Sequence, residues 1–269
     1  MKAYVLIREA PWYRREAFVS GLRAAGHEVQ VKPPSRLDKQ TVLVIWNRYA
    51  GNHELATQVE RAGGTVLVAE NGYLGAGGTS PKFDVHPVGP QPHHYYCIAR
   101  GFHNDDARVV QGSALRFPLL GIALSPWRAD GAHVLVCPNR AFGVPGRSMP
   151  PDWPERCADR LRRHTNRPVR VRAHPGNTAP KRSLLEDLLG AWACVVWTSS
   201  CGVHALAAGV PTYCEAPHWI LRSAASKNNI NCPDLPDREP HFERMSWSQW
   251  TVAEIASGEP FRHLLPTAG

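Results

Sequence analysis

The sequence predicts an α/β protein with two doubly wound halves. Short apolar runs alternate with segments of helical periodicity from residue 3 to 69, and the alternation restarts at residue 133. A stretch with Pro and Gly but little periodicity, residues 117–127, separates the two series and is typical of a linker. The length of 269 residues suits one large domain or two of about 100–150 residues. We therefore expect domains at residues 1–125 and 126–269.

The first half is predicted to contain four strands and two helices. The strands are expected at 3–9, 28–32, 41–47 and 65–69, and the helices at 11–25 and 55–60. The continuous apolar run at 41–47 indicates a strand buried on both faces of a parallel sheet. Glu70 and the glycine-rich segment 71–78 follow the last of these strands, at the edge where open α/β sheets bind ligands. Residues 93–106, rich in His and Tyr, are expected to form a loop, either simply ordered on the surface or functional.

The second half repeats the pattern. Strands are expected at 133–137, 168–172, 195–197 and 210–214, and helices at 153–164, 184–191 and 203–208. The proline-rich segment 222–241 is predicted to be a loop, and residues 248–255 an amphipathic helix. Three strand ends, near residues 138, 173 and 199, are expected to face one crevice.

A hydroxyl-rich turn before the third helix of this half predicts an anion site. The turn directs backbone N–H groups and the positive helix end at one point, most simply a phosphate, with Ser199, Ser200 and Gly202 as donors. The alternative is that Ser199 only caps the helix. Arg172 and His174 at the neighbouring strand end would add positive charge.

Charge, cysteine content and apolar runs limit the classes of ligand and partner that we expect. The net charge of +8 and the pI near 9.3 favour polyanionic ligands, such as nucleic acid, acidic lipid or nucleotide. Seven cysteines without a Cys-x-x-Cys pair favour free core thiols over disulfides or zinc. No apolar run approaches the roughly 20 residues of a membrane span, and the first apolar run is too short for a signal peptide. We expect a cytoplasmic protein with no membrane partner and no metal.

The segment Ser-Ser-x-Gly, small residues, Ala-Gly-Val-Pro and a strand (199–214) resembles the donor-binding segment of GT-B glycosyltransferases. Arg-x-His-Pro-Gly at 172–176 resembles their basic-x-His-Pro element. The similarity is nearest to Kdo-transferase-like capsule enzymes and to phage-encoded members of the fold, and it covers residues 130–260 best. It implies two Rossmann-like domains facing a central cleft, with the last helix crossing back to the first domain. Arg140 follows the first strand of the second half and is expected to be a further cation at the donor site. The resemblance implies that Glu215 binds the ribose.

The resemblance implies sugar transfer from a nucleotide donor, with a UDP-sugar expected and no cofactor required. The base that deprotonates the acceptor is expected in the first domain, with Glu70 and His103 as candidates and Asp105 and Asp106 behind them. The phrases at 70–75 and 247–259 are similar to phage proteins, and the positive charge fits a phosphate-tracking surface. The predicted acceptor is therefore a hydroxymethylated pyrimidine in phage DNA, in the host cytoplasm. The alternatives are a glycan-directed, CMP-sugar-using enzyme of the same fold and a non-catalytic module that binds a nucleotide or nucleic acid.

Overall fold

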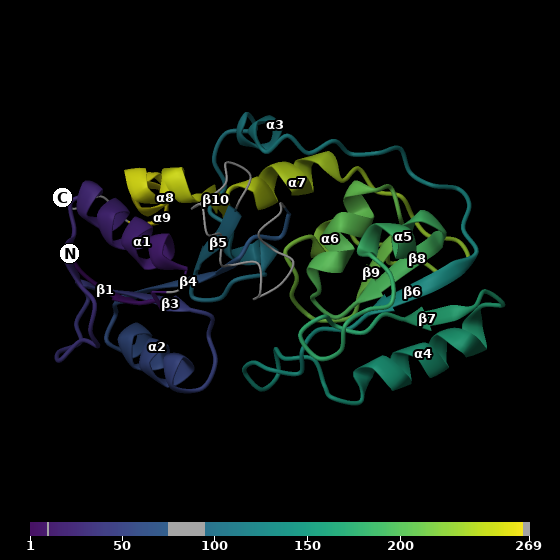
Figure 1. Ribbon diagram of the computed structural model, residues 1–269, viewed down its shortest axis with the longest axis horizontal. Helices are drawn as coiled ribbons and strands as arrows, with labels where there is room; N and C mark the ends of the chain where they lie inside the picture. The colour runs from purple at the N-terminus through teal and green to yellow at the C-terminus, as the bar shows by residue number, and fades with distance from the viewer. Residues whose placement is uncertain (10, 75–94, 266–269) are drawn as a thin grey trace. The chain divides into compact units, whose positions relative to one another are not determined.

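The computed structural model describes residues 1–9, 11–74 and 95–265, which form two compact units (Figure 1). The first unit comprises Met1–His103, Arg108–Gly112 and Trp247–Gly269, and the second comprises Asn104–Ala107 and Ser113–Ser246. The C-terminal segment thus belongs to the first unit rather than to the half that precedes it in the sequence. Half of the predicted glycine-rich segment, residues 75–78, and two histidines of the predicted polar cluster, His93 and His94, lie outside the described residues.

The first unit is built on a six-stranded sheet of order β10-β5-β4-β3-β1-β2. Its elements are β1 (Lys2–Leu6), α1 (Trp12–Ala24), β2 (Glu28–Gln30), β3 (Thr41–Trp46), α2 (Gly51–Arg61), β4 (Thr65–Asn71), β5 (Tyr95–Arg100), β10 (Gln249–Thr251), α8 (Val252–Ser257) and α9 (Glu259–Leu264). The strands β2, β1, β3 and β4 are parallel, as predicted, whereas β5 and β10 are antiparallel to their neighbours.

Strand β3 is buried on both faces, as the apolar run predicted. Val42 and Val44 pack with α1, α8 and α9, where the Phe18 and Phe261 rings lie 5.9 Å apart. Leu43 and Ile45 point to the opposite face and pack against α2. Figure 1 shows the two helical layers on either side of this sheet.

Two sequence predictions for this unit are wrong. Residues 93–106 are not one loop, because Tyr95–Ala99 form a buried strand between β4 and β10. The helix predicted at 248–255 starts only at Val252, since Thr251 is its N-cap: the Thr251 hydroxyl accepts the Glu254 amide at 3.2 Å, and the Glu254 carboxylate accepts the Thr251 amide at 2.7 Å. The residues before this capping box are free to pair as β10.

The second unit is built on a parallel four-stranded sheet of order β7-β6-β8-β9. Its elements are α3 (Arg116–Leu119), β6 (His133–Cys137), α4 (Trp153–His164), β7 (Val169–Val171), α5 (Leu184–Leu189), β8 (Ala191–Val196), α6 (Ser200–Ala207), β9 (Thr212–Cys214) and α7 (Glu239–Ser246). The predicted strand 133–137 and helix 153–164 agree with β6 and α4 residue for residue. The segments 117–127 and 222–241 are not purely loop, because α3 reaches into the first, and a short 3-10 helix (Arg222–Ala224) and the start of α7 lie in the second.

Helix α4 covers one face of this sheet, and α5 and α6 cover the other (Figure 1). Right-handed crossovers require this arrangement, because the chain moves outward from β6 to β7 and then back across to β8. On the α4 face, Trp153, Cys157 and Leu161 pack against the alternate strand residues Val134, Val136 and Val195.

Candidate functional site

The carboxyl ends of β7, β6, β8 and β9 meet at one edge of the second sheet, because all four strands are parallel. Open α/β sheets bind ligands at this edge. The loops that leave it carry most of the residues that the sequence predicted for a donor site: Arg140 after β6, Arg172 and His174 after β7, Ser199 and Ser200 after β8, and Glu215 after β9.

Helix α6 begins at Ser200, three residues earlier than predicted. Ser199 is its N-cap: its hydroxyl oxygen accepts the Cys201 amide at 3.3 Å, and the side chain is buried. Ser199 therefore caps α6, which is the alternative that the sequence left open, and its hydroxyl oxygen already accepts a hydrogen bond from this helix. Ser200 occupies the first helical position and is partly exposed, so its amide and hydroxyl are the accessible donors of this turn.

Gly202 allows close packing against Trp219, and its predicted role in binding phosphate stays a prediction. A Cβ at this buried position would lie 2.7 Å from Cζ2 of Trp219 and 3.1 Å from Cγ1 of Val196. The Trp219 ring is fully buried, and it occupies the space that a side chain at residue 202 would need. We therefore assign Gly202 to the contact between α6 and Trp219.

Two asparagines that the sequence did not single out fix the turn before α6. The Asn139 side-chain oxygen accepts the Thr198 amide at 2.8 Å and the Thr198 hydroxyl at 3.2 Å. Asn104 donates to the Thr198 carbonyl at 2.7 Å and accepts the Ile220 amide at 3.2 Å. Asn104 has a φ of 57°, a conformation in which asparagine is enriched. The polar turn is thus tied to the loops after β6 and β9.

Arg140, His174 and Gly176 form a second cluster at the edge. The Gly176 amide donates to Nδ1 of His174 at 3.0 Å, and a Cβ at Gly176 would lie 3.0 Å from Cδ of Arg140. Burial, reinforced by the Arg140 charge, lowers the pKa of His174 below its ordinary value. The imidazole is therefore neutral at pH 7. Because Nδ1 accepts a hydrogen bond, its proton is on Nε2, which is available as a donor.

Arg140 is exposed, and its guanidinium lies 4.8 Å above the Phe142 ring. The Phe142 ring is itself 57% exposed. An aromatic face and a cation in one loop suit a nucleotide, whose base stacks and whose phosphate is anionic.

Arg172 does not offer a free guanidinium at this cluster. Its side chain, only 10% exposed, pairs with Asp187 of α5 and donates to the Arg182 carbonyl at 2.8 Å. The pKa of Cys201, in the first turn of α6, is raised by its hydrogen bond with Cys137 and by burial, and the Arg172 charge opposes that rise.

Glu215 is directed at α4. Its carboxylate accepts the Trp153 indole N–H at 2.8 Å and pairs with Arg160. Both carboxylate oxygens therefore have partners on that helix, and the ribose-binding role implied for Glu215 would require that pairing to loosen.

The candidate bases belong to different units. Glu70 lies within β4 rather than after it, and its Oε1 accepts the Asn71 amide at 3.1 Å; His103 follows β5 in the same unit. Asp105 belongs to the second unit, where it accepts from Arg147 at 2.8 Å and its side chain is 10% exposed. Asp106 accepts from the Ser223 hydroxyl at 2.9 Å.

His218 is a site residue that the sequence analysis missed. It follows β9 beside the Arg147–Asp105 pair. Burial, with the Arg147 charge, lowers its pKa to about 4, while Asp105 opposes the shift. Within the described residues, its Nδ1 atom is buried and has no hydrogen-bond partner. The available signal was the Pro-His-Trp sequence in the loop after a strand end.

Metal ligation and membrane insertion find no support in the described part of the chain. Its residues contain no group of three or more His, Cys, Asp or Glu side chains that could hold a metal ion. Within the same residues, no helix has the length and apolar character needed to cross a membrane.

Comparison with known proteins identifies the fold. No protein-family model and no curated protein matches the chain. Among solved structures, the chain is similar to the β-Kdo 2,7-transferase of Thermosulfurimonas dismutans KpsC, with a TM-score of 0.54, 12% identity, and 97% and 99% of the two chains covered. It is also similar to the β-Kdo 2,4-transferase of the same KpsC, with a TM-score of 0.56, 10% identity, and 95% and 98% covered. The chain thus shares the α/β fold of two glycosyltransferases over nearly its whole length.

Proposed function

We propose that this chain is a glycosyltransferase that binds the phosphate of a nucleotide-sugar donor at the carboxyl edge of its second sheet. The observation that carries the proposal is the neutral His174, whose Nε2–H is available beside the exposed Arg140. Within the described residues, Arg140 has no ion-pair partner. The fold shared with two Kdo transferases over almost the full chain supports the proposal.

The transfer reaction explains why these groups are useful. The bond between the anomeric carbon and the phosphate oxygen breaks, and the electron pair stays on that oxygen. Donors that are fixed before the reaction stabilise the developing charge: the His174 Nε2–H, the Arg140 guanidinium and the amide of Ser200 at the start of α6. The acceptor oxygen forms the new bond to the anomeric carbon.

The acceptor hydroxyl must lose its proton to a base. We keep Glu70 and His103 of the first unit as the proposed bases. Asp105 is the weaker candidate, because its carboxylate already accepts a hydrogen bond from Arg147 at 2.8 Å. The Glu215 carboxylate contacts Trp153 and Arg160 of α4. It can bind the ribose only if these contacts are broken.

For the donor and the acceptor, the glycan-directed alternative is favoured over the DNA-modifying one. Both structural neighbours are Kdo transferases. We therefore propose a CMP-activated sugar in place of the UDP-sugar expected first, and a glycan hydroxyl in place of a modified pyrimidine. The net charge of +8 supports an anionic partner without distinguishing glycan from DNA.

A thermal-shift screen with CMP, CMP-sialic acid and UDP-, GDP- and TDP-sugars tests the donor site. A ligand at 100 times its dissociation constant adds about 2.7 kcal/mol of stability. The His174→Ala variant should bind the stabilising nucleotide about 10-fold to 100-fold more weakly, because one hydrogen bond to a charged phosphate is lost. His164→Ala, at the exposed end of α4, is the matched control and should bind normally. Equal loss in both variants, or no response to any nucleotide, would contradict the proposal.

The acceptor is tested separately with duplex DNA carrying hydroxymethylated pyrimidines and with acidic oligosaccharides. Sugar transfer to the oligosaccharide and no DNA affinity at low salt are expected. Transfer to DNA, with binding that weakens steeply as salt rises, would restore the DNA-modifying function. Nucleotide binding without hydrolysis or transfer would instead support the non-catalytic module.

A further inference from the structure

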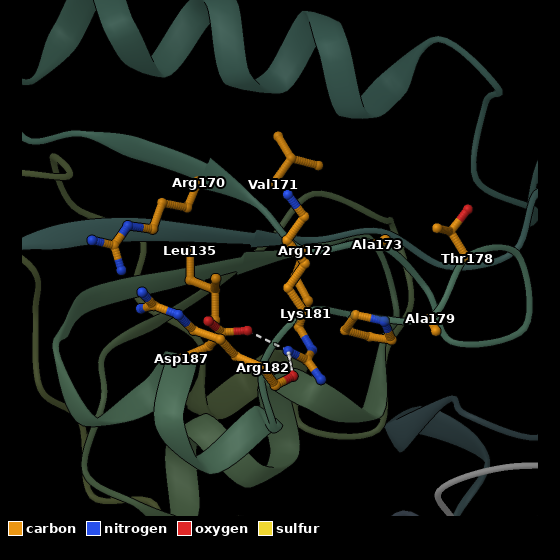
Figure 2. A pocket seen from close by; sticks show the side chains of 11 residues that line it. Leu135, Arg170, Val171, Arg172, Ala173, Thr178, Ala179, Lys181, Arg182 and Asp187 are labelled. Atoms are coloured by element: carbon orange, nitrogen blue, oxygen red, sulfur yellow. Dashed lines mark hydrogen bonds and ion pairs between the residues drawn. The ribbon is translucent and has the colours of Figure 1, made fainter.

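A cavity of about 490 Å³ lies between the edge strand β7 and helix α5 of the second unit (Figure 2). Its size falls in the range of small-molecule sites and far exceeds the volume of a single ion. The strand β7 pairs only with β6 among the described strands, so the cavity opens at the edge of the sheet.

Four cationic side chains and one carboxylate line this cavity. Figure 2 shows the Arg172 side chain directed at Asp187, and the same guanidinium donates to the Arg182 carbonyl at 2.8 Å. The Arg172 charge is therefore compensated. The other three cations are Arg170, Lys181 and Arg182.

These three cations have no hydrogen-bond or ion-pair partner for their side chains within the described part of the chain, and all three are exposed. Two exposed arginines on the nearby helix α4 do have carboxylate partners: Arg156 pairs with Asp152 at 3.2 Å, and Arg162 with Asp159 at 2.7 Å. Like charges gathered around one cavity repel one another, and a bound anion would relieve that repulsion.

The rest of the wall is largely apolar, with one hydroxyl. It is formed by Leu135, Val171, Ala173, Ala179, Pro180 and the side chain of Thr178. A ligand that fits must therefore combine an anionic group with a carbon framework of several atoms. A recessed cavity suits a small molecule or the end of a chain. A DNA duplex would instead need an extended surface along which its phosphates lie.

We propose that this cavity binds an anionic sugar, through a carboxylate or phosphate held by Arg170, Lys181 and Arg182, at a site additional to the donor phosphate site. The apolar wall contacts the sugar ring, and Thr178 offers a hydrogen bond to a ring hydroxyl. If the chain transfers sugars as proposed, an acidic residue at the end of a glycan acceptor has this chemistry. The binding itself does not depend on transfer activity.

Isothermal titration calorimetry with glucuronate, glucose 6-phosphate, glucose and inorganic phosphate tests the proposal. We expect glucuronate or glucose 6-phosphate to bind, glucose not to bind, and phosphate alone to bind at least about ten-fold more weakly than the sugar that carries the same group, because it leaves the apolar wall empty. The response to glucuronate and to glucose 6-phosphate distinguishes a carboxylate from a phosphate ligand. Binding of glucose equal to that of the anionic sugars would overturn the assignment. If glucose 6-phosphate binds, binding of phosphate equal to it would also overturn the assignment.

Matched variants locate the binding. The triple change Arg170→Gln, Lys181→Gln, Arg182→Gln should weaken binding by about ten-fold or more, since each charge-assisted contact is lost. The control Arg156→Gln, Arg162→Gln, Arg163→Gln removes the same number of charges from α4 and should stay within about two-fold of the unaltered protein. Equal effects of the two triples would show attraction to the overall charge and overturn the site.

Filling the cavity provides a second test that leaves its charge unchanged. Ala179→Trp, at an exposed wall position, should abolish binding of the anionic sugar and leave nucleotide binding intact. Unchanged sugar binding in this variant would overturn the proposal. Failure of the donor screen together with success here would reject the transferase function and keep this site.

Discussion

Replacing Asp187 by asparagine tests whether Arg172 is held as a structural cation. The substitution keeps the side-chain size and removes the negative charge that faces Arg172. The two side chains are only 13% and 10% exposed, so water replaces the lost partner poorly. Removing one partner of a buried ion pair costs about 3–5 kcal/mol, and the adjoining cavity admits some solvent, so we expect about 3 kcal/mol of destabilisation.

Urea unfolding monitored by circular dichroism measures this loss. The matched control is Asp159→Asn, which breaks the Arg162 pair on α4, where the side chains are 62% and 55% exposed. That change should cost less than about 0.5 kcal/mol. If the two units unfold in separate transitions, only the transition of the second unit should move for Asp187→Asn.

A loss no larger than the control would refute the reasoning for Arg172. So would an Asp187→Asn variant that keeps its stability and binds nucleotide phosphates more tightly, because Arg172 would then be a ligand-binding group restrained by Asp187. Replacing both partners, Arg172→Met with Asp187→Leu, should recover much of the lost stability, since an apolar pair leaves no buried charge behind.

Three further predictions concern the edge of the second sheet. Gly202→Ala should destabilise the protein by about 1–3 kcal/mol in thermal unfolding, because the new Cβ overlaps Trp219, and an unchanged melting temperature would contradict the packing role. His218 has a pKa of about 4 in the native state against 6.5 in the unfolded state, so the unfolded chain binds more protons between these values. The lowered pKa of His218 should therefore reduce the free energy of unfolding by about 1–2 kcal/mol between pH 7 and pH 4. In urea titrations, the His218→Asn variant should show a smaller reduction. Asn139→Ala removes two acceptor contacts to Thr198 and should cost about 1–3 kcal/mol, whereas Asn166→Ala on an exposed loop should cost almost nothing.

Sequence periodicity predicted the second sheet well because its strands are short, apolar and separated by amphipathic helices. The helix 153–164 has Trp153, Cys157 and Leu161 at helical spacing, and those residues are the ones that pack on the sheet. Periodicity failed at Tyr95–Arg100, where the high content of His and Tyr in residues 93–106 suggested a loop. That strand is stabilised by pairing with β4 and β10, and β10 lies about 150 residues later in the chain, beyond the reach of any local pattern.

The same distinction applies to the candidate site. The sequence placed Arg140, His174 and Ser200 at neighbouring strand ends, because parallel topology alone determines that edge. It did not determine where long side chains point. Arg172 and Glu215 also follow strands, yet each turns to a partner on a covering helix, Asp187 in one case and Arg160 in the other. The position of a residue along a strand thus predicts whether it lies at the carboxyl edge of the sheet. Whether its charge is neutralised by an ion pair can be seen only in the packed structure.

Whether a cation is paired or unpaired determines how strongly it can attract an anionic ligand. Around β7, Arg172 is neutralised by Asp187, while Arg170, Lys181 and Arg182 keep uncompensated charge at the same cavity, as far as the described residues extend. At the carboxyl edge, His174 is neutral and acts through a hydrogen bond, so Arg140 supplies the formal charge there. A donor site with one strong cation and a separate cavity with three predict different salt dependences. Raising the ionic strength should weaken binding of an anionic sugar more steeply than binding of a nucleotide, and equal slopes would indicate that both ligands occupy one site.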